Sequence, residues 1–205
     1  MSEYRTIEGS CIFELVEKKS RFIAHLCHVA NEEEALEFLN SIRKEHAQAR
    51  HNVYAYILNG GRARYSDDGE PAQTSGLPTY ETLMHNELSD VICVTTRYFG
   101  GTLLGTGGLV RAYTQACQGA IAEAAIVVVQ MCVDVKVELT YDLYQTATKV
   151  CDKHGASVLE TDFTDKVTLV TRICEQDAEA LVADLIDATN GKCAIESSEP
   201  FEGAL

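Results

Sequence analysis

Two arginines and five glycines near the middle of the chain have the residue types and spacing of an anion-binding site. The five glycines fall within nine residues, and an arginine stands on each side of them. The candidate residues are Arg97, Tyr98, Gly100, Gly101, Gly105, Gly107, Gly108 and Arg111. Glycine is favoured where the backbone adopts a positive φ or approaches another group closely. Backbone N–H groups at a helix start, with an arginine beside them, suit a phosphate or a carboxylate.

A buried strand and an amphipathic helix are predicted on the two sides of this turn. The run Val91-Ile92-Cys93-Val94 is typical of a strand buried on both faces, and apolar residues recur at helical spacing from Leu109 to Ala124. We expect Arg111 in the first turn of the helix, where the macrodipole disfavours a cation by about 0.3–1 kcal/mol. A sulfate, a phosphate or a nucleic-acid phosphate is therefore expected at the N-terminus of the helix that starts near Gly107. The alternative is that each arginine pairs with an acidic neighbour and the glycines only form a turn.

Three carboxylates form a second group of candidate residues upstream. Asp67, Asp68 and Glu70 lie in a long polar loop over residues 66–78, and loops of this length are usually functional or disordered. The carboxylates can ligate Mg²⁺, but such clusters are also common in solvated turns, and we expect no metal and no cofactor. We expect residues 66–71 to pack beside the two arginines, so that acids and arginines share a cleft.

Histidine and aromatic side chains complete the candidate set. His51 can act as a general base, but no nucleophile accompanies it in the sequence, so we expect it to form a structural hydrogen bond at a strand end. Tyr54, Tyr56, Tyr98 and Phe99 can stack on nucleic-acid bases, although such residues belong more often to the core, and we expect core positions here. No catalytic residue is assigned.

Composition limits the class of partner. The chain has 205 residues, with 17 basic and 31 acidic side chains and a net charge of −14, which weighs against indiscriminate binding to nucleic acid. Residues 1–130 contain 11 of the basic side chains, so the cations concentrate near the motifs. The eight cysteines contain no C-x-x-C pair and indicate free thiols in a reducing compartment. With no apolar run of about 20 residues, we expect a cytoplasmic protein that does not enter a membrane.

The chain is expected to divide into two α+β domains, residues 1–130 and residues 131–205. In the first domain we expect strands at 11–17, 21–29 and 51–58, a helix from an Asn31–Glu34 capping box to about residue 46, and a short helix with Pro78 as its first residue. In the second domain, one-sided alternation from Val133 to Leu139 begins a β-α-β-β-α-β order, which is the ferredoxin-like pattern. We expect its sheet to be antiparallel and four-stranded, with both helices on one face.

Four motifs together resemble the YigZ/IMPACT family. They are Lys19-Ser20-Arg21-Phe22, residues 51–56, residues 66–71, and residues 97–101 continuing to Arg111-Ala112-Tyr113. The resemblance implies a first domain with the ribosomal-protein-like βαβ fold of elongation factor G domain IV. It implies a ferredoxin-like second domain similar to domain V of that factor. The family's eukaryotic members regulate translation by binding a partner of a stress kinase.

Two functions follow from these observations. The leading hypothesis is a non-enzymatic cytosolic regulator or accessory factor of translation or the stress response, which binds RNA, the ribosome or a translation-associated protein. Its binding face would comprise the residues around Arg97, the glycine turn, His51 and the acidic loop. The alternative is a hydrolase-type enzyme that acts on a small phosphorylated or peptide substrate with the acidic loop. The sequence does not indicate an oligomeric state.

Overall fold

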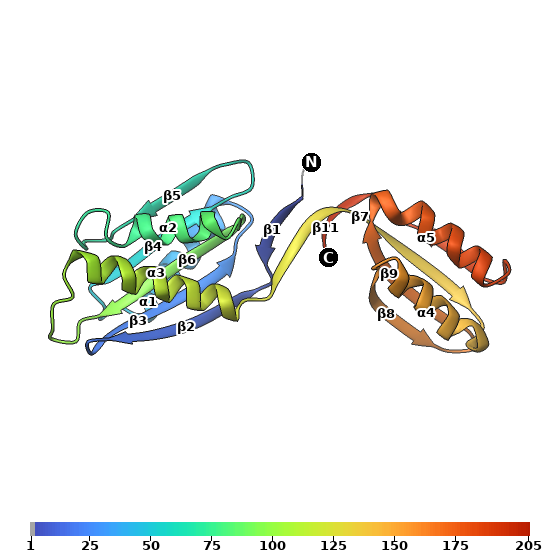
Figure 1. Cartoon of the computed structure of the whole chain (residues 1–205), viewed down its shortest axis with the longest axis horizontal. Helices are drawn as coiled ribbons and strands as arrows, with labels where there is room; N and C mark the ends of the chain where they lie inside the picture. Colours follow the sequence, from blue (N-terminus) through green and yellow to red (C-terminus); the bar gives the residue numbers. More distant parts are fainter. Residues whose placement is uncertain (1–2) are drawn as a thin grey trace. The chain divides into compact units, whose positions relative to one another are not determined.

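The chain forms two compact α+β units, as the computed structural model shows for residues 3–205 (Figure 1). The first unit comprises Tyr4–Val127, and the second comprises residues 128–205 together with Glu3. The expected fold class, α+β with two domains, is confirmed. No helix within residues 3–205 is long and apolar enough to cross a membrane.

The first unit is built on a five-stranded sheet in which every neighbouring pair is antiparallel. The strand order is β2 (Ser10–Glu17), β3 (Ser20–His28), β6 (Val91–Tyr98), β4 (His51–Ile57) and β5 (Ala63–Ser66). A short strand, β1 (Tyr4–Ile7), precedes them in the sequence. β6 is central, and its residues 91–97 are all buried, as the unbroken apolar run predicted.

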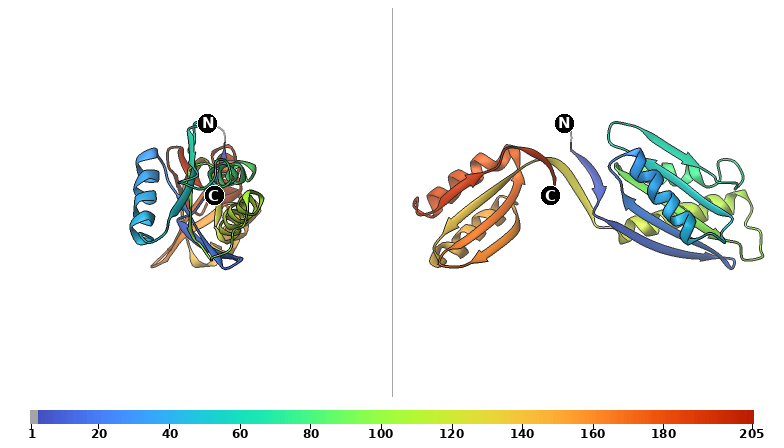
Figure 2. Two further views of the ribbon diagram at one scale, coloured as in Figure 1. Left: turned by 90° about the vertical axis from the view of Figure 1, so that its left-hand side faces the viewer. Right: turned by 180° about the vertical axis from the view of Figure 1, so that it is seen from behind.

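Helices cover both faces of this sheet, because the buried strands carry apolar side chains on both sides (Figure 2, left). α1 (Glu32–Glu45) packs Ala35, Leu39 and Ile42 against one face. α2 (Gly76–His85) and α3 (Thr106–Glu123) lie on the other face, where α3 buries Tyr113 among apolar residues of β3, β4 and β6. The sheet is therefore fixed from both sides, and the ends of β4 and β6 are held in register beside each other.

The beginnings of three helices can be compared with the predictions. The capping box of α1 is confirmed, since the Asn31 side chain accepts a hydrogen bond of 2.9 Å from the Glu34 N–H. α2 begins at Gly76, so Pro78 is its third residue and not its first. α3 begins at Thr106, which places Arg111 in the second turn, so the expected first-turn position was wrong. The short strand β5 was not predicted.

The second unit has the ferredoxin-like order that the sequence predicted. Its elements are β7 (Ile126–Leu139), a 3₁₀ turn (Tyr141–Leu143), α4 (Tyr144–Lys153), β8 (Ser157–Phe163), β9 (Val167–Cys174), α5 (Glu175–Ala188), β10 (Ala194–Ser197) and β11 (Phe201–Ala204). The strands pair in the order β10-β7-β9-β8, and all these pairs are antiparallel. β11 pairs with the first part of β7.

One-sided alternation determines how this second sheet is covered. Val133, Val135, Val137 and Leu139 are buried in the core, whereas the intervening Asp134, Lys136 and Glu138 are partly exposed. The same core contains residues of both α4 and α5, so both helices lie on one face of the sheet. The alternating strand thus has its single covered face, as expected.

Candidate functional site

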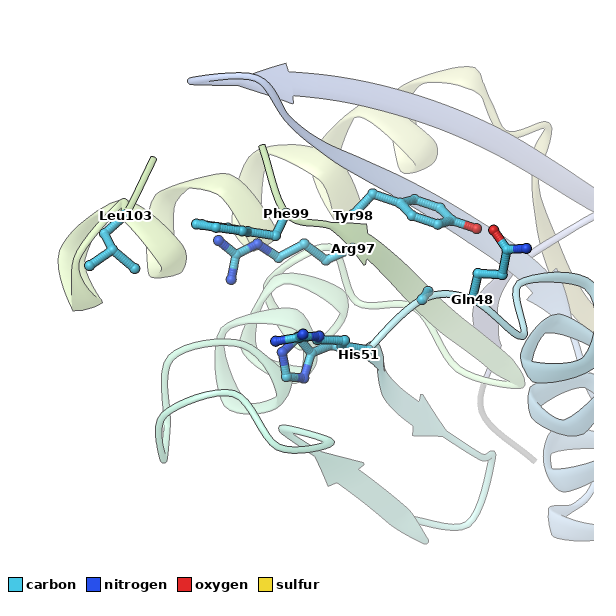
Figure 3. Close-up of a pocket in the computed structure, with 8 residues that line it drawn as sticks. Gln48, His51, Arg97, Tyr98, Phe99 and Leu103 are labelled. Carbon is cyan, nitrogen blue, oxygen red and sulfur yellow. The ribbon is translucent and has the colours of Figure 1, made fainter. Parts of the chain in front are cut away.

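A pocket of about 610 Å³ opens at the edge of the first unit where β4 begins and β6 ends (Figure 3). Its lining comes from the loop after α1, the first residue of β4, the end of β6 and the turn that leads to α3. The lining residues are Gln48, Ala49, Arg50, His51, Arg97, Tyr98, Phe99 and Leu103. The sheet register brings two of these groups together, because His51 on β4 is the direct partner of Arg97 on β6.

The Arg97 guanidinium is buried between aromatic rings and a carboxylate. Its Nη1 donates to Glu70 Oε1 at 2.7 Å and to Oε2 at 3.0 Å, and its Cζ lies 5.4 Å from the Phe22 ring centroid and 5.7 Å from that of Phe99. The side chains of Arg97 and Glu70 are only 8% and 3% exposed. Among the described residues, nothing accepts a hydrogen bond from Arg97 Nε, although this atom is buried.

Glu70 has a second buried donor on its other side. The Tyr113 hydroxyl donates to Glu70 Oε1 at 2.8 Å. Burial, together with the adjacent Glu70 charge, raises the pKa of Tyr113 well above its usual value, so the phenol stays neutral and remains a donor. The predicted pairing of the acidic loop with the two arginines is thus confirmed for Arg97, which forms a buried ion pair with Glu70; among the described residues, Arg111 forms no ion pair with this loop.

The acidic loop fixes the orientation of the His51 ring. His51 Nδ1 lies 2.8 Å from the Asp68 carbonyl oxygen, and a carbonyl can only accept, so the proton is on Nδ1. In the neutral form of the ring, the lone pair is therefore on Nε2. No described residue forms a hydrogen bond with that nitrogen, and the ring lines the pocket together with Arg97 (Figure 3). The expected strand-end hydrogen bond of His51 is confirmed.

The other two carboxylates of the loop are engaged by the fold. Asp68 accepts from the Asn52 N–H at 2.7 Å and from Arg43 Nη2 at 3.0 Å. Asp67 Oδ1 accepts from the N–H groups of Ser75 and Gly76, at 3.0 and 2.9 Å, and so caps the start of α2 from a distance in sequence. Burial raises the pKa of Asp67, but its backbone hydrogen bonds and the one from the Ser75 hydroxyl outweigh burial and lower it overall.

These contacts decide what the acidic loop does chemically. Each of Asp67, Asp68 and Glu70 is bound to backbone N–H groups, to an arginine or to a hydroxyl, and none lines the pocket. No group of three or more His, Cys, Asp or Glu side chains within residues 3–205 is placed to hold a metal ion. The loop is therefore a scaffold that positions Arg97 and His51 from behind the pocket.

The glycine turn is required by close approach and by backbone conformation. A Cβ on Gly100 would lie 2.0 Å from the Lys19 carbonyl carbon, and the Gly100 N–H donates to Ser20 Oγ at 3.1 Å. Gly101 and Gly105 have φ values of +83° and +73°. Gly105 occupies the N-cap of α3 and offers no side-chain cap, so the N–H groups that begin with Thr106 face an exposed surface.

Arg111 does not line the same pocket as Arg97. It lines a smaller hollow of about 160 Å³ with Glu17, Lys18, Leu104 and other residues of α3. Gly108 also lines that hollow, and a Cβ on Gly107 would lie 3.8 Å from Arg111 Nη1. The Arg111 guanidinium therefore lies near the first turn of α3 and outside the pocket that Arg97 lines.

Sequence reasoning missed part of the lining. Phe99 was expected in the core but is 56% exposed, because it follows the last residue of β6 and no helix covers that position. Leu103 is 82% exposed, and Arg50 is exposed with no ion-pair partner among the described residues. Tyr54 and Tyr56 are buried as expected. The only available signal for Arg50 was its position next to His51.

Comparison with known proteins agrees with this architecture. The Impact N-terminal domain matches residues 18–121, and a domain of unknown function (DUF1949) matches residues 137–192. A solved crystal structure, described as a hypothetical protein, covers 97% of this chain and 98% of its own, with 28% identity and a TM-score of 0.62.

Bacterial relatives match between about half and nearly all of the chain. An IMPACT family member of Haemophilus influenzae is 35% identical over 205 residues, which are 97% of this chain and 98% of the relative. The IMPACT family member YvyE of Bacillus subtilis is 33% identical over 201 residues, which are 97% and 93%. YigZ of Escherichia coli is 46% identical over 100 residues, which are 47% of this chain and 49% of the relative. The two domains and the motif residues around the pocket thus place this chain in the IMPACT family.

Proposed function

We propose that this protein is a non-enzymatic accessory factor or regulator of translation in the cytoplasm, and that it binds RNA through its pocket face. The pocket face is the surface formed by the lining residues of the pocket, the glycine turn and the first turns of α3 with Arg111. The link to translation comes from the family, because the resemblance implies that its eukaryotic members regulate translation. The choice of RNA comes from the chemistry of the face itself.

The observation that carries the proposal is the sign of the charge in the pocket. The lining contains Arg50, which has no ion-pair partner among the described residues, and Arg97, whose charge Glu70 balances from behind the pocket; no described lining residue is a carboxylate. The whole chain nevertheless has a net charge of −14. A cationic pocket on an acidic protein favours a specific anionic partner over non-specific association with polyanions.

Exposed apolar side chains beside the cations favour RNA as that anion. Phe99 and Leu103 are 56% and 82% exposed, and both line the pocket. Single-stranded nucleic acid is bound by cations that follow its phosphates and by aromatic rings on which its bases stack. A simple inorganic anion would use the arginines but leave the Phe99 ring uncovered.

The start of α3 supplies a second position for a phosphate, beside a hollow separate from the pocket. The Gly105 cap leaves the first N–H groups of the helix without a side-chain partner, and the Arg111 guanidinium lies near Gly107. A helix N-terminus combined with a cation suits a phosphate oxygen. We therefore include the stretch from Gly100 to Arg111 in the RNA-binding face.

The proposal is tested with sedimentation of purified ribosomes and with fluorescence anisotropy of a labelled RNA oligonucleotide. The wild-type chain is compared with Arg50→Ala and Arg111→Ala, and with Arg62→Ala as a control. Arg62 is also an exposed arginine, but it pairs with Glu32 away from the pocket. We expect binding that weakens with salt, a loss of affinity in the first two variants, and no change in the control.

Two results would contradict RNA binding by this face. One is an affinity that is insensitive to both salt and the two substitutions. The other is binding to ribosomal protein that persists after nuclease has digested the RNA, which would indicate a protein partner instead.

A further inference from the structure

We infer that the pocket is a subsite for one ribonucleotide of a single RNA strand, with the base stacked on Phe99 and the ribose 2′-hydroxyl donating to His51 Nε2. The inference rests on the proposed function and specifies which part of the RNA the pocket reads. Three observations carry it: an exposed ring against a buried guanidinium, a histidine nitrogen that accepts in the neutral ring, and an arginine in the same pocket that has no ion-pair partner among the described residues.

The Phe99 ring is available for stacking and is held in position. The ring lies beside the Arg97 side chain (Figure 3). It is 56% exposed, while the Arg97 guanidinium lies 5.7 Å from its centroid and is itself fixed by Glu70. The ring of Phe22 supports Arg97 from another side at 5.4 Å. A nucleobase on Phe99 extends this existing stack and covers apolar surface that water now contacts.

His51 determines which kind of sugar fits. Because Nδ1 donates its proton to the Asp68 carbonyl, the neutral ring presents Nε2 as a hydrogen-bond acceptor. Asp68 cannot move away easily, since its carboxylate binds the Asn52 N–H and Arg43. A phosphate diester oxygen has no proton to donate to Nε2, but a ribose 2′-hydroxyl does. That hydroxyl is the group by which proteins distinguish RNA from DNA.

The remaining space and charge match one nucleotide. The pocket measures about 610 Å³, within the range of about 300–1,000 Å³ that holds small ligands. Arg50 precedes His51 in the chain, lines the same pocket and has no acidic partner among residues 3–205. It is therefore free to neutralise the phosphate of the nucleotide whose 2′-hydroxyl reaches His51.

The experiment compares three oligonucleotides that differ only at the 2′ position. Labelled decamers of uridine, deoxyuridine and 2′-O-methyluridine are titrated with the full chain by fluorescence anisotropy. The 2′-O-methyl group has no proton to donate, so it tests the hydrogen bond on unaltered protein. We expect the ribo-oligomer to bind about 2- to 12-fold more tightly than the other two, the range of one net hydrogen bond.

Two variants with matched controls assign the effect. His51→Ala removes the acceptor and should make the three oligomers bind equally, whereas His85→Ala, at an exposed histidine of α2, should preserve the preference. Phe99→Ala should weaken all three oligomers by about 5- to 150-fold, the range for one stacked base. Phe163→Ala is the control, since Phe163 is similarly exposed at 53% and lies in the second unit.

The outcomes separate this inference from the proposed function. Equal affinity of wild-type chain for the three oligomers, or a ribose preference that survives in His51→Ala, overturns the ribonucleotide subsite. If binding then still depends on salt and on Arg111, the proposed function stands without the subsite. Absence of binding to every oligomer overturns RNA recognition itself. Circular dichroism of each variant establishes that it is folded before its affinity is interpreted.

Discussion

Removing the carboxylate that faces Arg97 should cost more stability than any surface ion pair of this chain. Glu70 and Arg97 have side chains that are 3% and 8% exposed, and Glu70 also accepts from the buried Tyr113 hydroxyl. In Glu70→Ala the guanidinium stays buried without a counter-charge. Breaking a buried pair in this way costs about 3–5 kcal/mol.

Less drastic substitutions should give a graded series. Glu70→Gln keeps the shape and one carbonyl oxygen but loses the charge, so we expect a cost between that of Glu70→Ala and wild type. Tyr113→Phe removes one hydrogen bond to a charged acceptor and should cost about 1.5–3 kcal/mol. Because the Tyr113 hydroxyl donates to Glu70 itself, the Glu70→Ala/Tyr113→Phe double variant should cost less than the sum of the two single variants.

The assay must report on the first unit alone, because the chain folds as two units. Urea unfolding is followed by far-ultraviolet circular dichroism, and hydrogen exchange of the β4 and β6 amides assigns each transition. Arg62→Ala is the control. Arg62 Nη1 lies 2.8 Å from Glu32 Oε2, but the two side chains are 68% and 33% exposed, so their ion pair should contribute less than about 1 kcal/mol. If Glu70→Ala costs no more than Arg62→Ala, the reasoning from burial is wrong.

Three further predictions concern the elements around the site. Asp67→Asn should cost about 0.5–2 kcal/mol in urea unfolding. Because hydrogen bonds lower the pKa of Asp67 in the fold, the stability that Asp67 contributes is complete above about pH 4 and falls as the pH drops below that value. This pH dependence should be absent in Asp67→Asn. Gly100→Ala should lower the melting temperature far more than Gly107→Ala, because its Cβ would lie 2.0 Å from the Lys19 carbonyl carbon whereas that of Gly107 would meet, among the described residues, only Arg111 Nη1, at 3.8 Å. Burial, with the nearby His46, lowers the pKa of His25, so the unfolded chain binds the proton first and stability should fall as the pH drops below about 6.5, by at most about 1.4 kcal/mol per pH unit; His25→Gln should flatten that slope.

Local pattern was sufficient for the elements that carry their own periodicity. The apolar run of β6, the capping box at Asn31 and the alternation from Val133 to Leu139 each depend on residues close together in the sequence. Their physical causes are equally local: burial of both strand faces, satisfaction of the first N–H groups of a helix, and burial of one strand face. For this reason the ferredoxin-like order could be predicted.

The composition of the pocket could not be predicted in the same way. His51 and Arg97 become neighbours because β4 pairs with β6 in one particular register, and no local pattern determines that register. Asp67 caps α2 from nine residues before its first residue, through a loop conformation that the sequence does not specify. The exposure of Phe99 depends on where β6 ends relative to α3, and that position is a tertiary property.

The acidic loop explains why an anion site can coexist with so much negative charge. Glu70 engages Arg97 through Nη1 only, and the guanidinium still lines the pocket. Asp68 turns its carboxylate to Arg43 and to a backbone N–H, and presents only its carbonyl oxygen to His51. The carboxylates thus hold the pocket from behind and add no negative charge to its lining. Substitutions at Asp67 and Asp68 should therefore weaken ligand binding by disordering the loop that positions His51, whereas Glu70→Ala also leaves the charge of Arg97 uncompensated.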